Sequence, residues 1–411
     1  MTYEIQLTIT AASPLAIGRQ KPGGSVSEAE SYIPASVIRG AIASGILRES
    51  ESPTPEAGDD FHSLFLGENA AIFQNGYPAI AKIQDKPTLL PNPIQVLPAT
   101  AVSSKTNPGF KTDPKKHGVF DTLIDRFCAG GYNHPYDPNC PVDCGRVEPY
   151  SGFYACVGNN YYQLSTTTRL LTRVGINRRR ATSEEQVLYS IEVLNEVEGK
   201  EEPATYRSKI LLDNEELANN LTDFINRHSF RLGGSASRGL GKAEIIADIG
   251  NAAATVEPRI AKFNDELKKR WQKWGEIFGE TQQDLLLDRT YFTIDLQSDA
   301  IFTENWQRTT VINDRMLKKY AAIDDPSLKL HVAYTSYDYR SGWNTAWGLM
   351  KDVELVTNKG AVYLFSTSSP DIWYRALGNL ELKGVGERTS EGFGQVQVCN
   401  EFHLVFRENA V

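Results

Sequence analysis

The chain has 411 residues, which is long enough for two domains that each bury a hydrophobic core. Hydrophobic residues make up 41% of it, yet no apolar run approaches the roughly 20 residues of a membrane-spanning helix. The net charge of −8 argues against a protein that holds nucleic acid over its whole surface, although local basic patches can still contact phosphate.

The N-terminal part of the chain predicts a strand, a helix and then an irregular insertion. Residues 3–11 alternate apolar and polar side chains as a strand does, so no signal peptide is expected and the expected compartment is the cytoplasm. After a Gly-, Ser- and Glu-rich loop at 18–31, residues 32–43 predict a helix capped by Ser36. Residues 85–160 hold many Pro, Gly and Asn, which indicates an insertion without a core of its own.

A hairpin, a helix and a strand follow the insertion. Residues 161–171 and 186–197 predict two paired strands. Asp213, with Glu216 three residues later, forms a variant of the capping box and marks the start of a helix. The next strand is expected to reach about residue 247.

The C-terminal part of the chain repeats this pattern. A linker at 248–257 leads into an amphipathic helix expected at 259–279. Strands are then expected at 291–296, 330–340 and 360–367. Pro370 occupies the first-turn position that proline favours, which predicts a further helix before a last strand.

One glycine-rich loop occurs twice, at 233–241 and 386–394, about 150 residues apart. Each copy follows an expected helix, ends in Gly-(Leu/Phe)-Gly and leads into an alternating strand. Glycine lets the backbone turn tightly and approach a ligand, and successive N–H groups in such a loop can bind an anion.

The repetition predicts two α+β domains of ferredoxin-like order, β-α-β-β-α-β. We expect the first domain at 1–250, with a cysteine-containing loop insertion at about 85–160. A linker and helix at 251–287 would connect it to a second ferredoxin-like domain at 288–411.

Three features resemble the RAMP superfamily of CRISPR-associated proteins, whose members have ferredoxin-like, RRM-type folds. The first is the pair of glycine-rich loops. The second, at 32–40, reads Tyr-Ile-Pro-Ala-Ser-Val-Ile-Arg-Gly and resembles the family's Ile-Pro-Gly-Ser-Ser-Leu-Arg-Gly segment. The third, at 339–349, reads Tyr-Arg-Ser-Gly-Trp-Asn-Thr-Ala-Trp-Gly-Leu and is similar to the two-domain RAMP subunit of type III-D interference complexes.

This resemblance implies a subunit that acts in antiviral defence without being an enzyme. Such a subunit grips CRISPR RNA near its 5′ repeat-derived handle and contacts the large polymerase/cyclase-type subunit and the first RAMP backbone subunit. A RAMP endoribonuclease is one alternative, with His117 or His228 in metal-independent cleavage of the repeat RNA. A target-cleaving ribonuclease would instead use Asp113, Asp121 or Asp125, and a protein-only assembly adaptor is a further alternative.

Arginines gather at the tip of the expected hairpin, where no acidic residue occurs from 169 to 183. The guanidinium group matches phosphate with a planar fork and stacks on bases, so an RNA contact is predicted. A solvated loop tip or a contact with an acidic partner surface is the alternative. The candidates are Arg169, Arg173, Arg178, Arg179 and Arg180.

The glycine-rich loops and the first helix supply the remaining RNA-binding candidates. The first loop has no acidic residue, whereas Glu387 and Glu391 weaken the case for the second. Arg39, in the first turns of the first helix, suits either a phosphate or an ion pair with a carboxylate. These candidates are Arg39, Gly233, Gly234, Ser235, Ser237, Arg238, Gly239, Gly241, Lys242, Gly386, Arg388 and Gly392.

Four of the five cysteines lie close together in the sequence. Thiolates and imidazoles are zinc ligands, and in the cytoplasm such a cluster favours a metal over disulfides. We predict a structural zinc with ligands drawn from Cys128, His134, Cys140, Cys144 and Cys156, of which His134 or Cys156 would be the fourth. Separate, partly buried thiols are the alternative.

Overall fold

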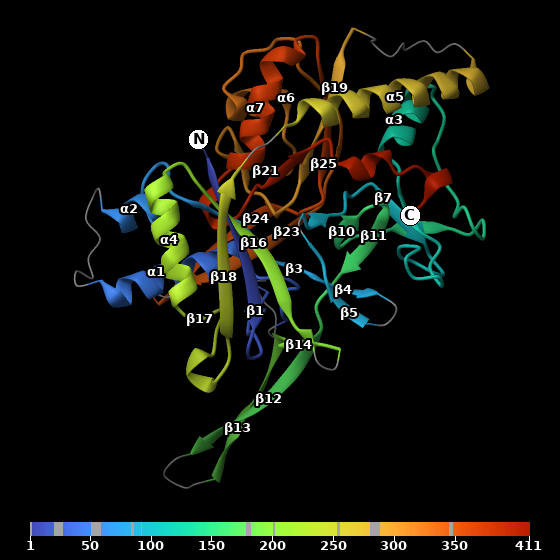
Figure 1. The fold of residues 1–411 in the computed structure, drawn as a ribbon. Helices are drawn as coiled ribbons and strands as arrows, with labels where there is room; N and C mark the ends of the chain where they lie inside the picture. The colour runs from blue at the N-terminus through green and yellow to red at the C-terminus, as the bar shows by residue number, and fades with distance from the viewer. Residues whose placement is uncertain are drawn as a thin grey trace.

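The computed structural model describes residues 2–19, 28–50, 59–83, 86–91, 93–177, 182–199, 202–252, 255–279, 288–344 and 348–411. The candidates Arg178, Arg179 and Arg180 therefore lie outside the described residues, as do residues 345–347. Two antiparallel sheets form the centres of two modules, and an inserted lobe lies beside them (Figure 1). None of the described helices is long and apolar enough to cross a bilayer.

The first module is an antiparallel sheet of order β17-β18-β1-β16-β2, in which β3 also pairs with β16. Ile5 and Leu7 of β1 face two helices and pack in one cluster with Ile38 of α1 and Leu221 of α4. The alternation of β1 is thus explained by one covered face. The elements are β1 (Tyr3–Ala11), α1 (Ala35–Glu49), α2 (Asp60–Phe65), β2 (Ile72–Phe73), β3 (Tyr77–Pro78), β16 (Thr205–Leu212), α4 (Glu215–Arg227), β17 (Phe230–Arg231) and β18 (Lys242–Asn251).

The second module has the sheet order β22-β25-β19-β26 and is covered on both faces. On one face Phe292 of β19 packs against Trp373 of α7, and on the other Tyr291 is hydrogen-bonded through its backbone to Asn264 of α5. Burial along β19 and β25 is therefore almost continuous. The elements are α5 (Glu257–Phe278), β19 (Thr290–Leu296), β20 (Phe302–Glu304), β21 (Gln307–Thr309), α6 (Asp314–Ala321), β22 (Lys329–Tyr334), β25 (Val362–Thr367), α7 (Pro370–Lys383) and β26 (Val396–Val398).

The two modules share one order of elements. The strands lie in the order β18-β1-β16-β2 in the first module and β26-β19-β25-β22 in the second. A helix follows the first and third strands in sequence, α1 and α4 in one module and α6 and α7 in the other. The repetition of the glycine-rich loop thus extends to the topology of the chain.

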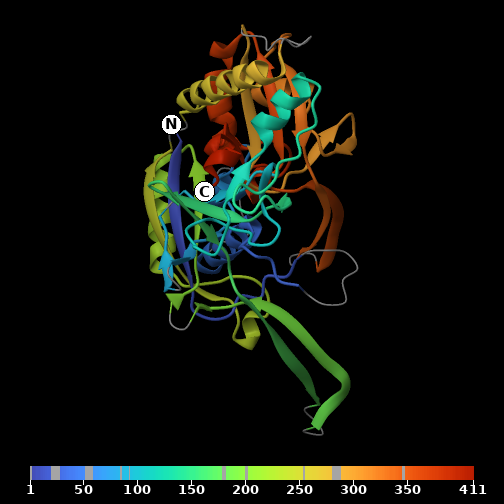
Figure 2. The ribbon, with the colours of Figure 1, turned by 90° about the vertical axis from the view of Figure 1, so that its right-hand side faces the viewer.

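A long hairpin is inserted at the equivalent place in both modules, between the second and third strands in sequence. In the first module it consists of β12 (Thr168–Asn177) and β13 (Thr182–Leu194), and in the second of β23 (Tyr337–Asn344) and β24 (Leu349–Thr357). The register shifts once in each hairpin, after Val174 and after Arg340. Hairpin β12–β13 extends away from the body of the molecule (Figures 1 and 2).

The inserted lobe does contain a core, contrary to the expectation for residues 85–160. Phe110, Phe120 and Tyr154 are buried together with Phe402 and Val405. The sequence of the insertion is poor in apolar residues because C-terminal residues complete its core. Its elements are β4 (Ile80–Ile83), β5 (Lys86–Leu89), β6 (Gln95–Val96), β7 (Ala101–Ser104), β8 (Val119–Asp121), α3 (Leu123–Gly131), β9 (Val147–Pro149), β10 (Phe153–Val157) and β11 (Asn160–Leu164). After hairpin β12–β13, β14 (Val197–Glu198) and β15 (Glu202–Pro203) pair with each other.

Two helix starts differ from the sequence prediction. The first helix begins at Ala35, whose N–H donates to Asn75 Oδ1 at 2.8 Å, so Ser36 is inside the helix and is not its cap. The cap of α4 is Asn214, which accepts from the N–H of Leu217 at 3.1 Å. Asp213, the predicted cap, instead accepts a hydrogen bond from the hydroxyl of a threonine in the N-terminal segment.

A buried imidazole joins the inserted lobe to the second module. His403 lies between Asp121 of β8 and Asp295 of β19, with ring nitrogens 3.2 and 2.8 Å from the two carboxylates. Burial alone would lower the pKa of His403, but the two carboxylates outweigh it and raise the pKa from 6.5 to about 10. The protonated ring therefore holds two buried acidic groups together.

This raised pKa predicts a specific dependence of stability on pH. The contribution of protonated His403 should be complete below about pH 6.5 and should disappear as pH rises through about 10. The difference in unfolding free energy between wild type and His403→Gln, measured in urea, should therefore shrink from pH 7 to pH 10.

His331 provides a matched control for this measurement. It is also largely buried, but burial and two nearby cations lower its pKa to about 4, so it is neutral throughout this range. The effect of His331→Gln should stay constant from pH 7 to pH 10. A constant effect for His403→Gln as well would contradict the assigned ion pairs.

Candidate nucleic-acid interface

The two glycine-rich loops follow the same backbone path. In both, a left-handed residue precedes a single 3-10 turn, and a left-handed glycine ends that turn. Four positions of the first loop have the same positive sign of φ as their equivalents in the second loop. The angles in the first loop are 85° for Gly233, 58° for Ser235, 85° for Gly239 and 86° for Gly241. In the second loop they are 86° for Gly386, 58° for Arg388, 90° for Gly392 and 67° for Gly394.

Each loop closes on the segment that follows the first strand of its own module. A Cβ atom on Gly233 would lie 2.5 Å from the carbonyl oxygen of Ala16, and one on Gly386 would lie 2.5 Å from that of Ile301. The neighbouring N–H groups of Gly234 and Glu387 donate to these same oxygens at 2.8 and 3.0 Å. Glycine is thus required here by close backbone approach and not only by a turn.

The surroundings of the first loop leave it open to solvent. Residues 236–239 are exposed, and no hydrogen-bond acceptor is found within the described residues for the N–H groups of residues 235–237. Arg231, Arg238 and Lys242, which lie in or next to the loop in sequence, are exposed. The first loop thus combines unpaired donors with positive charge, as an anion site requires.

The second loop is packed against the first module. Gly392 is buried, and a Cβ atom there would overlap the Cβ of Ala35 at the start of α1. Arg388 donates to the carboxylate of Glu391 through both Nε and Nη2 and lies 5.0 Å from the ring of Phe393. The second loop therefore serves as a contact between modules, and its arginine is neutralised within the loop.

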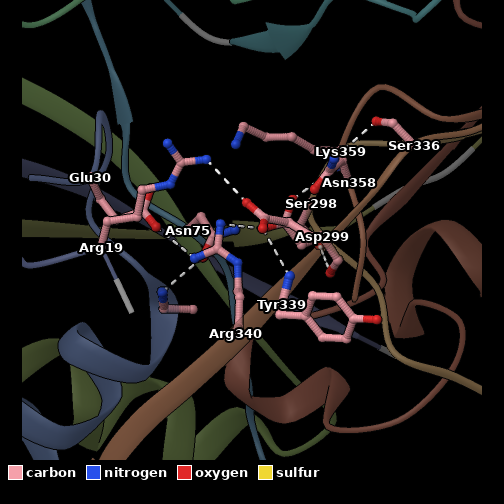
Figure 3. Close-up of polar contacts among 12 residues, drawn as sticks. Arg19, Glu30, Asn75, Ser298, Asp299, Ser336, Tyr339, Arg340, Asn358 and Lys359 are labelled. Atoms are coloured by element: carbon pink, nitrogen blue, oxygen red, sulfur yellow. Dashed lines mark hydrogen bonds and ion pairs between the residues drawn. The ribbon is translucent and has the colours of Figure 1, made fainter. Parts of the chain in front are cut away.

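Beside this contact, Arg340 joins the two modules through two buried carboxylates. Its guanidinium lies 2.6 Å from Glu30 of the first module and 2.5 Å from Asp299 of the second (Figure 3). The side chains of Glu30 and Asp299 are only 6% and 5% exposed. With Gly392, they line a cavity of about 40 Å³ between the modules. Arg340 belongs to the segment at 339–349 that carries part of the family resemblance. This arginine of the segment therefore has a structural role.

Arg39 is occupied by packing. Its guanidinium donates to the carbonyl of Phe65 and lies 5.5 Å from the ring of the same residue. Burial lowers the pKa of Arg39, an effect that the nearby carboxylate of Glu391 opposes. The structure thus supplies partners for Arg39 between α1, α2 and the second loop, and a phosphate is not needed to explain its position.

The first loop and the base of hairpin β12–β13 form one surface. Leu240 of the loop is buried with Val193 of β13, and Leu171 of β12 packs against them. The guanidinium of Arg238 lies 5.5 Å from the ring of Tyr189 and donates to its hydroxyl. The RNA-binding candidates of the first loop and those of the hairpin, which are far apart in sequence, therefore lie next to each other.

The hairpin arginines within the described residues differ in their surroundings. Arg169 is paired with Glu196 at 2.9 Å and sits at the base of the hairpin. Arg173 is half-buried further along the same strand. The triplet at 178–180 follows β12 in sequence and lies outside the described residues.

The predicted zinc ligands are not brought together. Cys128 is buried in the core of the second module, and the ring of His134 lies 3.9 Å from that of Phe278. Cys156 is exposed and donates to the carbonyl of Gly158. Only Cys140 belongs to a cluster of possible ligands within the described residues, and its neighbours there are His117 and Asp143.

The candidate catalytic residues have structural partners. Asp125 is bonded to Arg270 at 2.5 and 2.8 Å, and Asp121 holds His403. His228 pairs with Glu49 at 2.6 Å. These contacts explain the presence of the acids and of this histidine without a reaction.

A scan against protein-family models finds no match, and no curated protein matches the sequence. Among solved structures, a chain of the type III-B Cmr-beta complex bound to cognate target RNA and AMPPnP has a TM-score of 0.39 and 12% identity, covering 91% of this chain and 93% of that chain. A chain of the apo Cmr-beta complex has a TM-score of 0.31 and 14% identity, covering 59% and 96%. A chain of a Cas6 product complex has a TM-score of 0.27 and 13% identity, covering 49% of this chain and 81% of that chain. These scores are too low to assign a function.

The contrast between the two loops predicts different costs for the same substitution. Gly239→Ala and Gly392→Ala both place a side chain at positive φ, which costs on the order of 1–2 kcal/mol. Only Gly392→Ala also forces an overlap, with Ala35, because nothing lies within 4 Å of a Cβ at Gly239. The second variant should therefore lose a further ~1–3 kcal/mol of unfolding free energy in urea. Equal losses would show that the second loop is not packed as described.

Proposed function

We propose that the chain is a non-catalytic RNA-binding subunit of a type III CRISPR interference complex, of the type III-D kind, acting in the cytoplasm. Its two modules would be ferredoxin-like RAMP domains, which the strand orders β18-β1-β16-β2 and β26-β19-β25-β22 support. The bound RNA would be the 5′ repeat-derived handle of the CRISPR RNA, as the resemblance at 32–40 and 339–349 implies.

The observation that carries this proposal is the shared surface of the first loop and hairpin β12–β13. Burial of Leu240 against Val193 fixes the exposed N–H groups of residues 235–237 beside the arginine-bearing hairpin. N–H donors and guanidinium groups along one path suit a ribose-phosphate chain, because they contact successive phosphates. The overall charge of −8 does not oppose this, since phosphate contacts depend on local basic groups and not on the net charge.

A different surface suits protein partners. Hairpin β23–β24 carries exposed apolar residues, among them Tyr337, Leu349 and Val353. Side chains of this kind are favoured at protein interfaces and are costly when left in water. We therefore assign contacts with other subunits, such as the large subunit and a backbone subunit, to the hairpin of the second module.

The two loops offer a matched test of RNA binding. Ser237 and Ser390 occupy equivalent positions, but Ser237 is exposed beside the hairpin and Ser390 belongs to the packed loop. Ser237→Glu should weaken binding of a repeat-handle RNA by on the order of tenfold, because a carboxylate repels phosphate. Ser390→Glu should leave the affinity unchanged. Fluorescence anisotropy at fixed salt measures both, and equal affinities for the two variants would contradict the assignment.

The arginine triplet at 178–180 gives an independent measurement. Each phosphate contact that is lost from single-stranded RNA should reduce the slope of log affinity against log salt by roughly 0.7. Replacement of Arg178, Arg179 and Arg180 by alanine should therefore lower both affinity and slope. Unchanged binding by a variant that remains folded would favour the protein-only adaptor.

Absence of catalysis is tested with the same RNA. Incubation of the chain with repeat RNA in EDTA, and with a complementary target in Mg²⁺, should return both RNAs intact. Products in EDTA would indicate the histidine mechanism, and metal-dependent cutting of the target would indicate an aspartate mechanism.

A further inference from the structure

The inserted lobe contains a cluster of three possible metal ligands that the sequence does not place together. His117 Nδ1 lies 3.5 Å from the sulfur of Cys140 and 3.4 Å from Oδ2 of Asp143. All three ligand atoms lie within 4.8 Å of one another. An imidazole, a thiol and a carboxylate are the three side chains that most often bind zinc in proteins.

The two distances agree with a tetrahedral zinc site. With zinc bonds of about 2.0–2.3 Å, the edges of a tetrahedron are about 3.5 Å between nitrogen and sulfur and about 3.4 Å between nitrogen and oxygen. His117 Nδ1 is therefore spaced from the sulfur and from the carboxylate oxygen as it would be in a zinc site, and all three atoms lie within 4.8 Å of one another.

Neighbouring groups orient two of the ligands. The side-chain amide of Asn107 lies 3.1 Å from Nε2 of His117, so the other ring nitrogen points toward Cys140. Asp143 accepts from the hydroxyl of Thr106 at 2.9 Å and from the N–H of Gly145 at 3.0 Å. Partners of this kind fix the tautomer and the ring plane of a metal-binding histidine and the direction of a ligating carboxylate.

The cluster lies at the surface of the lobe, and the sulfur of Cys140 is its buried member. Cys140 is 1% exposed, whereas the side chains of His117 and Asp143 are 17% and 32% exposed. An ion could therefore enter from solvent, and a water molecule could occupy the fourth position. Cys140 and Asp143 have the two-residue separation typical of a zinc knuckle, with the carboxylate in place of the second thiolate.

We infer that His117, Cys140 and Asp143 bind a zinc ion that ties the loop at 105–118 to the turn at 139–145. On binding, the thiol of Cys140 loses its proton to solvent and its sulfur forms a bond to zinc, while the imidazole and the carboxylate donate lone pairs. The chemistry of the donors, one soft sulfur with nitrogen and oxygen, favours zinc over magnesium or calcium.

The first experiment measures metal in the full chain purified without chelators. Mass spectrometry of the digested protein should find about one zinc per chain, as one mononuclear site requires. Replacement of zinc by Co²⁺ should give a sulfur-to-metal charge-transfer band. A chain that neither retains zinc nor gives this band with Co²⁺ would overturn the proposal.

Variants identify the ligands. Asp143→Asn and His117→Gln preserve side-chain size and should bind zinc at least tenfold more weakly. Cys140→Ser should abolish the charge-transfer band. Cys144→Ser and Cys156→Ser, which remove exposed thiols outside the cluster, should keep both the zinc and the band. Loss of zinc from Cys144→Ser, with retention by His117→Gln, would overturn the assignment.

A control separates loss of metal from loss of structure. In excess EDTA, wild type and Asp143→Asn are both free of metal, so their unfolding temperatures give separate baselines that already include the hydrogen bonds of Asp143 with Thr106 and Gly145. With zinc added, only wild type should become more stable, since binding to the folded state adds to its stability. A rise in unfolding temperature on addition of zinc that is as large for Asp143→Asn as for wild type would contradict the proposal.

Discussion

Arg340 ties the two modules to each other through a buried network of ion pairs. Its guanidinium connects Glu30 of the first module to Asp299 of the second, and both carboxylates are almost fully buried. Breaking such a network leaves buried charge without a partner, which costs about 3–5 kcal/mol. Because Arg340 lies on hairpin β23–β24 just before its register shift, the same contact also fixes where that hairpin leaves the body. The packing of Gly392 on Ala35 lies beside this contact and shares its cavity.

Duplication of one loop has produced two different uses of the same backbone shape. The closing contacts with Ala16 and Ile301 are equivalent, so the shape belongs to the module and not to any ligand. What differs is the environment. Alanine at position 35 and the internal pair of Arg388 with Glu391 allow the second loop to be covered, whereas the first loop has basic neighbours and remains open. Conserved shape with divergent surroundings explains why glycine spacing alone does not distinguish a binding loop from a structural one.

Local patterns allowed much of the fold to be predicted. The alternation of β1, the apolar face of α5 and the proline that opens α7 each depend on neighbouring residues, and the structure confirms these elements. Contacts over long sequence separations were not predictable. Arg39 meets the carbonyl of Phe65, and His117 meets Cys140, only because the chain folds back. The zinc prediction included Cys140 because cysteines cluster there in the sequence, but it omitted His117 and Asp143 because it drew its ligands from the cysteines and His134.

The core of the inserted lobe has a consequence for synthesis of the protein. Phe110, Phe120 and Tyr154 leave the ribosome well before Phe402 and Val405, which complete their packing. The backbone of Val119 is likewise paired with that of Val411 through two hydrogen bonds. The lobe therefore cannot finish folding while translation of the second module is in progress, and its aromatic side chains stay accessible to chaperones during that interval. Maturation of the lobe is in this way coupled to completion of the domain that follows it.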